Sequence, residues 1–329
     1  MKAVTAAIGL AVCALSFADA ALGQDASNPF VRSDTAPAAS SPTACDAAFP
    51  SALPIRCWAG QQLVMLPKRE TFRHYPYDLY DSSGKEFLRV PYGELGGKLV
   101  TVTEVRWYDE PIIDLHGWLV RFRVDDTGKE YAVRASLPLA DPHADPDKIT
   151  MLDVALVRDL RAAREKYLGR KYWILRHELI ALDDKEIRGV RFKAFTPVTI
   201  SDVLAGDNSF VPVRLVVKND QGEEAFIDTA VSRSNGGGGT TAEIGDERLS
   251  HTLSSADPRS MFKFSPKVWK ALESGDVFVG MTKEQATMSW GEPQTINRTV
   301  TAGRTHEQWV YEHGSYLYFE GNVLTAIQN

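Results

Sequence analysis

Short segments in which apolar and polar residues alternate recur along the middle of the chain, and this alternation predicts β-strands. The segments are rich in Val, Ile, Thr, Tyr and Phe, the residues that favour strands. Two of them lead into turns that hold a glycine, at residues 125–128 and 219–222, which is typical of β-hairpins. The pattern therefore predicts a mainly β protein.

The same succession of segments occurs twice along the chain. Each half begins with an aromatic residue followed closely by glycine, continues with a Val/Thr-rich strand and ends with a glycine-containing hairpin. The matched segments are 58–66 with 167–175, 100–105 with 198–203, and 119–124 with 213–218. Sequences rich in strands also resemble one another by chance, but three matches in the same order predict an internal repeat.

About five short strands in each half indicate a small barrel or a tightly curled sheet. Each half resembles an SH3-like barrel of the kind found in bacterial envelope proteins. Between the halves, residues 150–168 are predicted to form a helix, because apolar residues recur there at helical spacing. Those positions are Leu152, Leu156, Leu160 and Ala163. Asp153 would lie in the first turn, where its charge suits the helix dipole.

The pattern changes near the C-terminus, where two short helices are predicted ahead of alternating strands. The first covers Pro266–Ser274. The second begins after Thr282, which forms a capping box with Gln285. It ends at Gly291 because glycine suits a left-handed C-terminal position. Alternating segments follow at 295–301, 305–311, 315–320 and 323–328.

The succession Gly280-Met281-Thr282, Gly291-Glu292-Pro293, residues 307–311 and residues 317–323 resembles the BamE/SmpA-type domain of bacterial outer-membrane assembly lipoproteins. That resemblance implies two helices packed on a three-stranded antiparallel sheet. It also implies a non-catalytic role in protein–protein contact near the outer membrane. Here the domain ends a longer chain, which favours a generic binding module with the same fold.

The N-terminus has the order of a secretory signal peptide. Lys2 precedes an apolar run at residues 4–17, and small residues follow up to Gly23. The run is shorter than the roughly 20 residues of a spanning helix. Cleavage fits after either Ala20 or Gly23, and we therefore expect a periplasmic or secreted protein after cleavage. Cys13 follows Val12 rather than a small residue, so no lipid anchor is expected, and no later run predicts a transmembrane span.

Composition divides the chain into successive parts. Residues 24–43 are rich in Ala, Ser, Pro and Asp and predict a disordered linker. Residues 232–260, with four glycines at 236–239, predict a second linker. The full division is signal peptide 1–23, linker 24–43, first SH3-like domain 44–137, connector with a helix 138–166, second SH3-like domain 167–231, Gly/Ser-rich linker 232–260 and BamE/SmpA-like domain 261–329.

Two cysteines, Cys45 and Cys57, remain after the predicted cleavage. In an oxidising compartment two cysteines this close usually form a disulfide. Closing the loop between them would stabilise the fold by about 3 kcal/mol. Two unrelated thiols are the alternative. The net charge of −6 argues against nucleic acid as the main partner.

The sequence offers little chemistry. Its seven histidines form no His-x-x-x-His motif, no Gly-x-Ser-x-Gly elbow occurs, and the four glycines lack the lysine of a phosphate loop. Glu70, Asp78 and Asp81 could supply an acid–base pair, although such density occurs by chance in an acidic chain. Three aspartates in residues 138–147 lack the glycine and glutamate of the known calcium loop. We therefore predict no catalytic residue, no metal site and no cofactor.

Aromatic residues are the better functional signal. The stretch 75–81 is similar to the aromatic and acidic segment that lines the peptide groove of eukaryotic SH3 domains, and such grooves bind extended proline-rich ligands. The candidate binding surface comprises Tyr75, Tyr77, Tyr80, Trp107, Tyr108 and Trp118. The alternative is that these rings fill a small core.

Two functions follow from these observations. The first is an exported, non-enzymatic adaptor that binds envelope proteins or cell-wall material. The second is a secreted or periplasmic hydrolase of a cell-wall polymer, with the β repeats as targeting modules. The missing catalytic set favours the adaptor.

Overall fold

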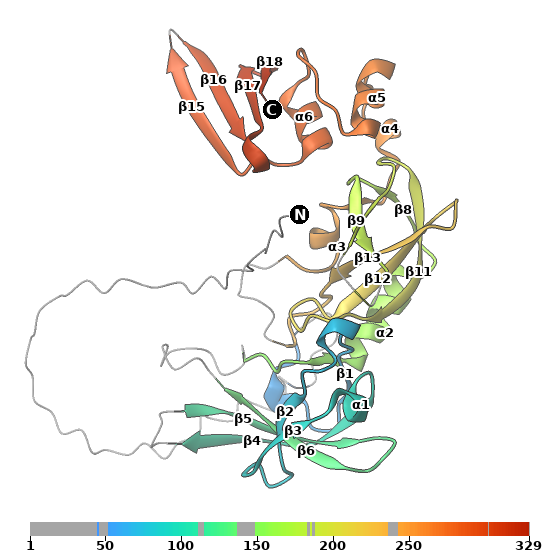
Figure 1. Cartoon of the computed structure of the whole chain (residues 1–329), viewed down its shortest axis with the longest axis vertical. Helices are drawn as coiled ribbons and strands as arrows, with labels where there is room; N and C mark the ends of the chain where they lie inside the picture. The colour runs from blue at the N-terminus through green and yellow to red at the C-terminus, as the bar shows by residue number, and fades with distance from the viewer. Residues whose placement is uncertain are drawn as a thin grey trace, which may run out of the picture. The chain divides into compact units, whose positions relative to one another are not determined.

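The computed structural model describes Cys45 and residues 52–110, 115–136, 149–182, 185, 188–235, 243–301 and 303–328 (Figure 1). The predicted signal peptide 1–23, the linker 24–43, the first part of the connector (138–148) and the four glycines at 236–239 lie outside these residues. No helix within the described ranges combines the length and the apolar character needed to cross a membrane.

The first described half of the chain builds one antiparallel sheet. Seven of its strands pair in the order β3-β2-β6-β5-β4-β1-β7. Their bounds are β1 Gln62–Met65, β2 Tyr77–Tyr80, β3 Phe87–Val90, β4 Leu99–Glu110, β5 Leu115–Val124, β6 Glu130–Ser136 and β7 Val154–Leu156. Three short helices accompany them: η2 Ile55–Cys57, η3 Glu70–Phe72 and α1 Tyr92–Leu95.

The second described half builds a sheet of the same design. Its order is β10-β9-β13-β12-β11-β8-β14, so every strand of the first sheet has its counterpart seven strands later. The bounds are β8 Lys171–Ile174, β9 Glu178–Ala181, β10 Gly189–Arg191, β11 Pro197–Ala205, β12 Val213–Asn219, β13 Glu224–Thr229 and β14 Leu253–Ser254. The helices are α2 Val157–Tyr167 and α3 Gly245–Leu249. The predicted internal repeat is thereby confirmed.

The two repeats agree in register as well as in strand order. The pairing of β4 with β5 shifts between Val102 and Glu104, and the pairing of β11 with β12 shifts between Ile200 and Asp202. A β-bulge bends its strand and increases the local twist. Because the bulge recurs at matched positions, both sheets curl at the same place.

The aromatic–Gly start of each repeat also has a shared role. Gly60 N donates to Val102 O, and Gly169 N donates to Ile200 O, each over 2.9 Å. Both glycines have positive φ, +80° and +73°, a region that glycine enters without steric cost. The glycines therefore form the turn that leads into β1 and β8.

Each sheet has its own hydrophobic core, built from the inward-facing residues of alternating strands. The largest buried side chains of the first core are Trp58, Tyr77 and Phe122. Those of the second core are Tyr167 and Phe192.

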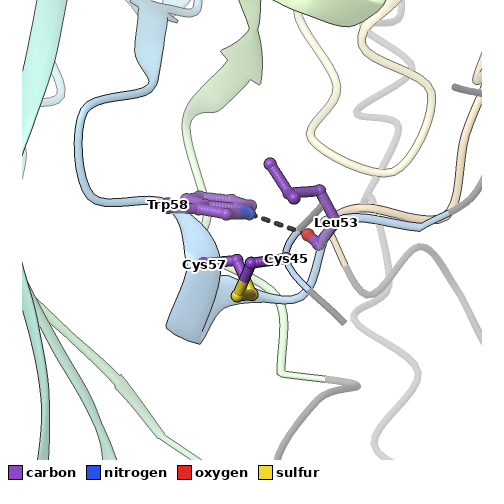
Figure 2. The surroundings of a disulfide bond; sticks show 4 residues. All are labelled: Cys45, Leu53, Cys57 and Trp58. Carbon is purple, nitrogen blue, oxygen red and sulfur yellow. Dashed lines mark hydrogen bonds between the residues drawn. A yellow bond between two sulfur atoms is a disulfide. The ribbon is translucent and has the colours of Figure 1, made fainter. Parts of the chain in front are cut away.

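A disulfide holds the start of the first repeat (Figure 2). It joins Cys45 to Cys57 with 5.3 Å between their Cα atoms, as the sequence predicts. Beside it, the buried indole of Trp58 donates its Nε1–H to Leu53 O over 2.9 Å. The disulfide and this hydrogen bond therefore tie Cys45 and Leu53 to Cys57 and Trp58.

The predicted helix at 150–168 is wrong in its first part. Residues 154–156 form strand β7, where Leu156 pairs with Leu63, and α2 begins only at Val157. Asp153 has a φ of +58° and lies outside any helix. The apolar spacing indicated a helix because all three residues of β7 are buried. The strand therefore shows no alternation of apolar and polar residues.

The predicted linker at 232–260 contains ordered structure on both sides of the four glycines. Ser234 Oγ accepts a hydrogen bond from Leu53 N (3.0 Å), and Asn235 bonds both the N–H and the C=O of Met151 (2.8 Å each). Short polar side chains thus form hydrogen bonds with buried backbone groups. The segment has few apolar residues, which indicated a linker, but these hydrogen bonds hold it in place instead. Beyond the glycines, α3 and β14 belong to the second repeat.

The C-terminal module joins helices to a third antiparallel sheet (Figure 1). The helices are α4 Pro258–Met261, α5 Pro266–Ser274, α6 Lys283–Trp290 and η5 Glu312–Gly314. The strands are β15 Thr295–Thr301, β16 Arg304–Val310, β17 Tyr316–Glu320 and β18 Val323–Gln328, in that order. The described sheet has four strands, not the three that the BamE/SmpA resemblance implies. The additional strand, β15, pairs with β16 along its whole length.

The N-terminal capping signal of α6 is confirmed. Thr282 accepts a hydrogen bond from Gln285 N (3.2 Å), and Gln285 Oε1 accepts one from Thr282 N (3.1 Å). This reciprocal arrangement is the capping box. At the other end Gly291 has a φ of +83° but a ψ of −172°, so the predicted left-handed helical conformation is wrong, although the positive φ still suits glycine.

One buried carboxylate ties this helix to the sheet. Glu307 accepts hydrogen bonds from Arg298 Nε (2.9 Å) and from Trp309 Nε1 (2.9 Å). Lys283 Nζ, from α6, lies 2.8 Å from the same carboxylate. Burial alone would raise the pKa of Glu307, but these three donors outweigh it and lower the pKa to about 2. The carboxylate is therefore ionised over most of the pH range.

Candidate functional site: an aromatic groove between the two repeats

A groove of about 490 Å³ lies where the two repeats meet; we call it the inter-repeat groove. The first repeat contributes residues around η3, the connector contributes Asp153, and the second repeat contributes the loop between β11 and β12. Its lining residues are Lys68, Arg69, Phe72, Tyr75, Asp153, Asp207, Asn208, Ser209 and Phe210.

Three aromatic side chains of the groove are exposed to solvent. Phe72 is 50% exposed, Tyr75 is 55% exposed and Phe210 is 47% exposed. The rings of Phe72 and Tyr75 stack with 6.4 Å between their centroids, and His74 lies 3.9 Å from the Tyr75 ring. Single exposed apolar residues are ordinary, but several gathered in one groove mark an interaction site.

The segment that carries Phe72 and Tyr75 is held in place by its own backbone. Phe72 N donates to Arg69 O (2.8 Å), and Tyr75 N donates to Phe72 O (3.0 Å). Lys68 Nζ donates to the carbonyl oxygens of Tyr75 (3.3 Å) and Pro76 (3.1 Å). The two rings are therefore presented on a fixed turn.

The loop that carries Phe210 is also fixed. Phe210 N donates to Asn208 Oδ1 (2.9 Å), and this local turn directs the backbone around the aromatic residue. Ser209 Oγ accepts a hydrogen bond from Asp153 N (2.8 Å), which joins the loop to the connector. The third ring thus reaches the groove from the second repeat on a loop fastened to the connector.

A buried ionic network underlies the groove. Arg69 of the first repeat lies 2.6 Å from Asp207 of the second, and Arg214 binds both Asp207 (2.7 Å) and Asp228 (2.8 Å). The guanidinium of Arg214 stacks on the Phe226 ring at 3.7 Å. Breaking such a buried pair by removing one partner costs about 3–5 kcal/mol. The pair Arg69–Asp207 therefore joins the two repeats at the groove, and Arg214 holds Asp207 in place.

Burial and ion pairing shift the pKa values of Arg214 and Asp228 in this network. Burial alone would lower the pKa of Arg214, but hydrogen bonds and charge from Asp228 and Asp207 outweigh it and raise the pKa. Burial raises the pKa of Asp228, although Arg214 opposes the effect. Arg214 remains charged at neutral pH because an arginine titrates only above pH 12.

Only Tyr75 of the predicted binding surface lies in the inter-repeat groove. Tyr77 is buried in the first core, where its hydroxyl donates to Leu66 O over 2.7 Å. Burial raises the pKa of Tyr77, which keeps it protonated. Tyr77 therefore fills the core, and its assignment to an exposed surface is corrected.

The other four aromatic residues lie on two faces of the first sheet. Trp107 and Trp118 are cross-strand partners with edge-to-face rings 4.9 Å apart, and both pack against the first core. Tyr80 and Tyr108 lie on the opposite face, where the Arg134 guanidinium is 4.6 Å and 5.4 Å from their rings. Successive side chains of a strand point to opposite faces, so the six residues do not form one surface.

Two residues of the groove, Phe72 and Phe210, were missed by the sequence reasoning. The available signal was local. Phe72 follows two charged residues and a threonine, and Phe210 sits among turn residues such as Asn208 and Ser209. A large apolar residue in a polar turn does not belong to a strand, so its side chain is not directed into the core that the strands build.

The carboxylates considered for acid–base chemistry have structural partners or face solvent. Asp81 accepts hydrogen bonds from Ser83 Oγ and from two backbone N–H groups, and these lower its pKa to about 2. Asp78 lies 3.8 Å from Arg89 on the neighbouring strand. Within the described ranges, no three His, Cys, Asp or Glu side chains gather closely enough to hold a metal ion.

Comparison of the chain with protein-family models, with curated proteins and with solved structures gives no match. The SH3-like and BamE/SmpA-like resemblances therefore stay predictions.

Proposed function

We propose that the protein is an exported, non-enzymatic adaptor of the cell envelope. In this proposal the inter-repeat groove binds an extended, proline-containing segment of an envelope protein. The observation that carries it is the gathering of three exposed aromatic rings, Phe72, Tyr75 and Phe210, in one groove whose walls are fixed. Aromatic-lined grooves bind polyproline-type segments because such ligands are already extended and lose little entropy.

Export is supported by the order of residues 1–23 and by the disulfide. The bond between Cys45 and Cys57 is typical of an oxidising compartment, such as the periplasm or the extracellular space. An adaptor also needs more than one contact surface. The proposal assigns the groove to one partner and leaves the C-terminal module, with its BamE/SmpA-like character, for a second contact.

The test is selection from a displayed library of random peptides on the purified chain without residues 1–23. We expect enriched peptides to contain prolines in an extended context and to bind with micromolar affinity. Removing an aromatic anchor should weaken binding at least about tenfold, since such anchors contribute about 1.4 kcal/mol or more. The variants Phe72→Ser and Phe210→Ser make this change at two independent positions.

Phe87→Ser is the matched control. Phe87 is 50% exposed, as Phe72 is, but it lies on β3 against Tyr80. Equal loss of affinity in Phe87→Ser and Phe72→Ser would contradict the proposal, and so would a failure to enrich any peptide. Sedimentation with purified cell-wall material tests the competing partner. If the wild-type chain binds cell-wall material but no peptide, and the groove variants lose that binding, the ligand of the groove is a glycan and not a protein segment.

A further inference from the structure

A second cavity, of about 750 Å³, lies between the second repeat and the C-terminal module; we call it the inter-module cavity. It is separate from the inter-repeat groove and shares no lining residue with it. The second repeat provides the turn between β8 and β9 and the start of β9. The C-terminal module provides α4 and the end of α6.

The two walls of the cavity are joined by one side chain. Phe195 belongs to the second repeat but is packed in the core of the C-terminal module, where it is 1% exposed. Its φ is +59°, which is unusual for a residue other than glycine. The strain costs about 1–2 kcal/mol, and burial of a phenylalanine offsets it with about 1.5–3 kcal/mol.

The first repeat shows what this position looks like without a partner. Gly97 N donates to Met65 O (3.0 Å), as Phe195 N donates to Ile174 O (2.7 Å). Gly97 also has a positive φ, +75°. The same backbone turn thus carries glycine in one repeat and a buried phenylalanine in the repeat that docks the module. Phe195 is therefore an anchor.

Polar contacts reinforce the anchor. Arg259 Nη1 donates to Phe195 O (2.8 Å), and Arg259 also pairs with Glu273. Lys193 lies 2.9 Å from the same carboxylate. With both walls fixed in this way, the cavity is formed before any ligand arrives, which lowers the entropic cost of binding.

The interior of the cavity is mostly apolar. Phe195 and Phe262 line it together with Met261, Met288 and Trp290. The Trp290 indole is held by a hydrogen bond from Nε1 to Gly275 O (3.0 Å). Methionines are flexible and adapt to apolar ligands of different shape.

A single arginine brings charge into these walls. Arg176 is half-buried, and its Nε donates to His251 O over 2.8 Å. Among the described residues no carboxylate lies within ion-pair distance of it. Its guanidinium packs against Gly291, where any Cβ would collide with it. A guanidinium has five N–H donors, so most of the hydrogen-bonding capacity of Arg176 is left for a ligand.

Acidic residues near the cavity are directed elsewhere or face water. The carboxylate of Glu178 approaches Gly189 on the neighbouring strand β10. Glu243 lies 2.5 Å from the His251 ring. Glu292 is exposed at the edge. The cation inside the apolar walls is therefore Arg176.

From this arrangement we infer that the inter-module cavity binds a carboxylate with a long apolar chain. The carboxylate pairs with Arg176 in the two-pronged geometry that guanidinium favours, and the chain lies along the methionines and Trp290. The cavity volume falls within the range of small-molecule sites, about 300–1,000 Å³. This binding activity goes beyond the adaptor function and does not depend on the inter-repeat groove.

Titration calorimetry of the chain without residues 1–23 tests the inference, with dodecanoate below its micelle concentration as the probe. We expect one molecule bound per chain, and at least tenfold weaker binding of dodecanol and of dodecyltrimethylammonium. Arg176→Gln should weaken dodecanoate binding at least tenfold, and Arg176→Lys should recover part of it. Met288→Trp should remove binding by filling the cavity.

Arg248→Gln is the matched control, because Arg248 is exposed and likewise donates its Nε to a backbone carbonyl, Asp228 O (3.1 Å). It should leave dodecanoate binding unchanged. Absence of dodecanoate binding to the wild-type chain would overturn the inference. So would equal binding by Arg176→Gln, or equal affinity for dodecanol, provided that thermal unfolding shows the variant to be folded.

Discussion

Substitutions of Phe195 separate two energies at this position: the stabilisation from burying the ring and the cost of the positive φ. Phe195→Ala removes a buried ring, which costs about 3–5 kcal/mol in a packed core, and keeps a Cβ at a φ of +59°. Phe195→Gly removes the same ring and also relieves the backbone strain of about 1–2 kcal/mol. We therefore predict that the glycine variant is more stable than the alanine variant by about 1 kcal/mol, the reverse of the usual order.

Urea unfolding followed by tryptophan fluorescence measures this difference, because Trp269 stacks edge-to-face on Phe195 at 5.5 Å. Gly97→Ala in the first repeat is the control. A Cβ at position 97 meets nothing within 4 Å, so its predicted cost of about 1–2 kcal/mol comes from the backbone alone. An alanine variant at 195 that is as stable as the glycine variant would refute the reasoning. So would a loss below about 1 kcal/mol in both.

Three further predictions concern the described fold. The pKa of Glu307 is lowered to about 2, so its ionised form stabilises the fold by about 3 kcal/mol above pH 4.5, and this stabilisation is lost as the pH falls toward 2. In acid unfolding, Glu307→Gln should therefore lose less stability between pH 4.5 and pH 2 than the wild-type chain. Cys45→Ser should lower the free energy of unfolding by about 2–4 kcal/mol in urea, and reducing agent should have no further effect on it. Asn235→Ala should cost about 1–3 kcal/mol, because it leaves the backbone N–H and C=O of Met151 without their partner; a change below about 0.5 kcal/mol in differential scanning fluorimetry calibrated against urea would contradict this.

The repeat could be predicted because its signals are local and occur twice. Strand segments, hairpin glycines and the glycines that precede β1 and β8 keep their spacing, so the two halves could be matched segment by segment, whereas the order of strands within each sheet was not predicted. The capping box at Thr282 and the pair Cys45–Cys57 were predictable for the same reason, since each rests on residues close in sequence.

The connector and the linker were mispredicted because their structure depends on distant partners. Strand β7 exists because β1 offers it a free edge, and residues 232–235 are ordered because Leu53 and Met151 present backbone groups to them. The inter-repeat groove is of the same kind. Phe72 and Phe210 line one groove only because the repeats pack together, and no local pattern contains that information.

Site-specific photocrosslinking in the envelope of the source cell tests the central claim most directly. A benzophenone amino acid replaces Tyr75 in the inter-repeat groove, and the control carries it in place of Phe87. The account predicts a discrete crosslinked envelope protein from position 75 only, with the crosslink mapped by mass spectrometry to an extended, proline-containing segment. No crosslink from position 75, or the same products from positions 75 and 87, would contradict it.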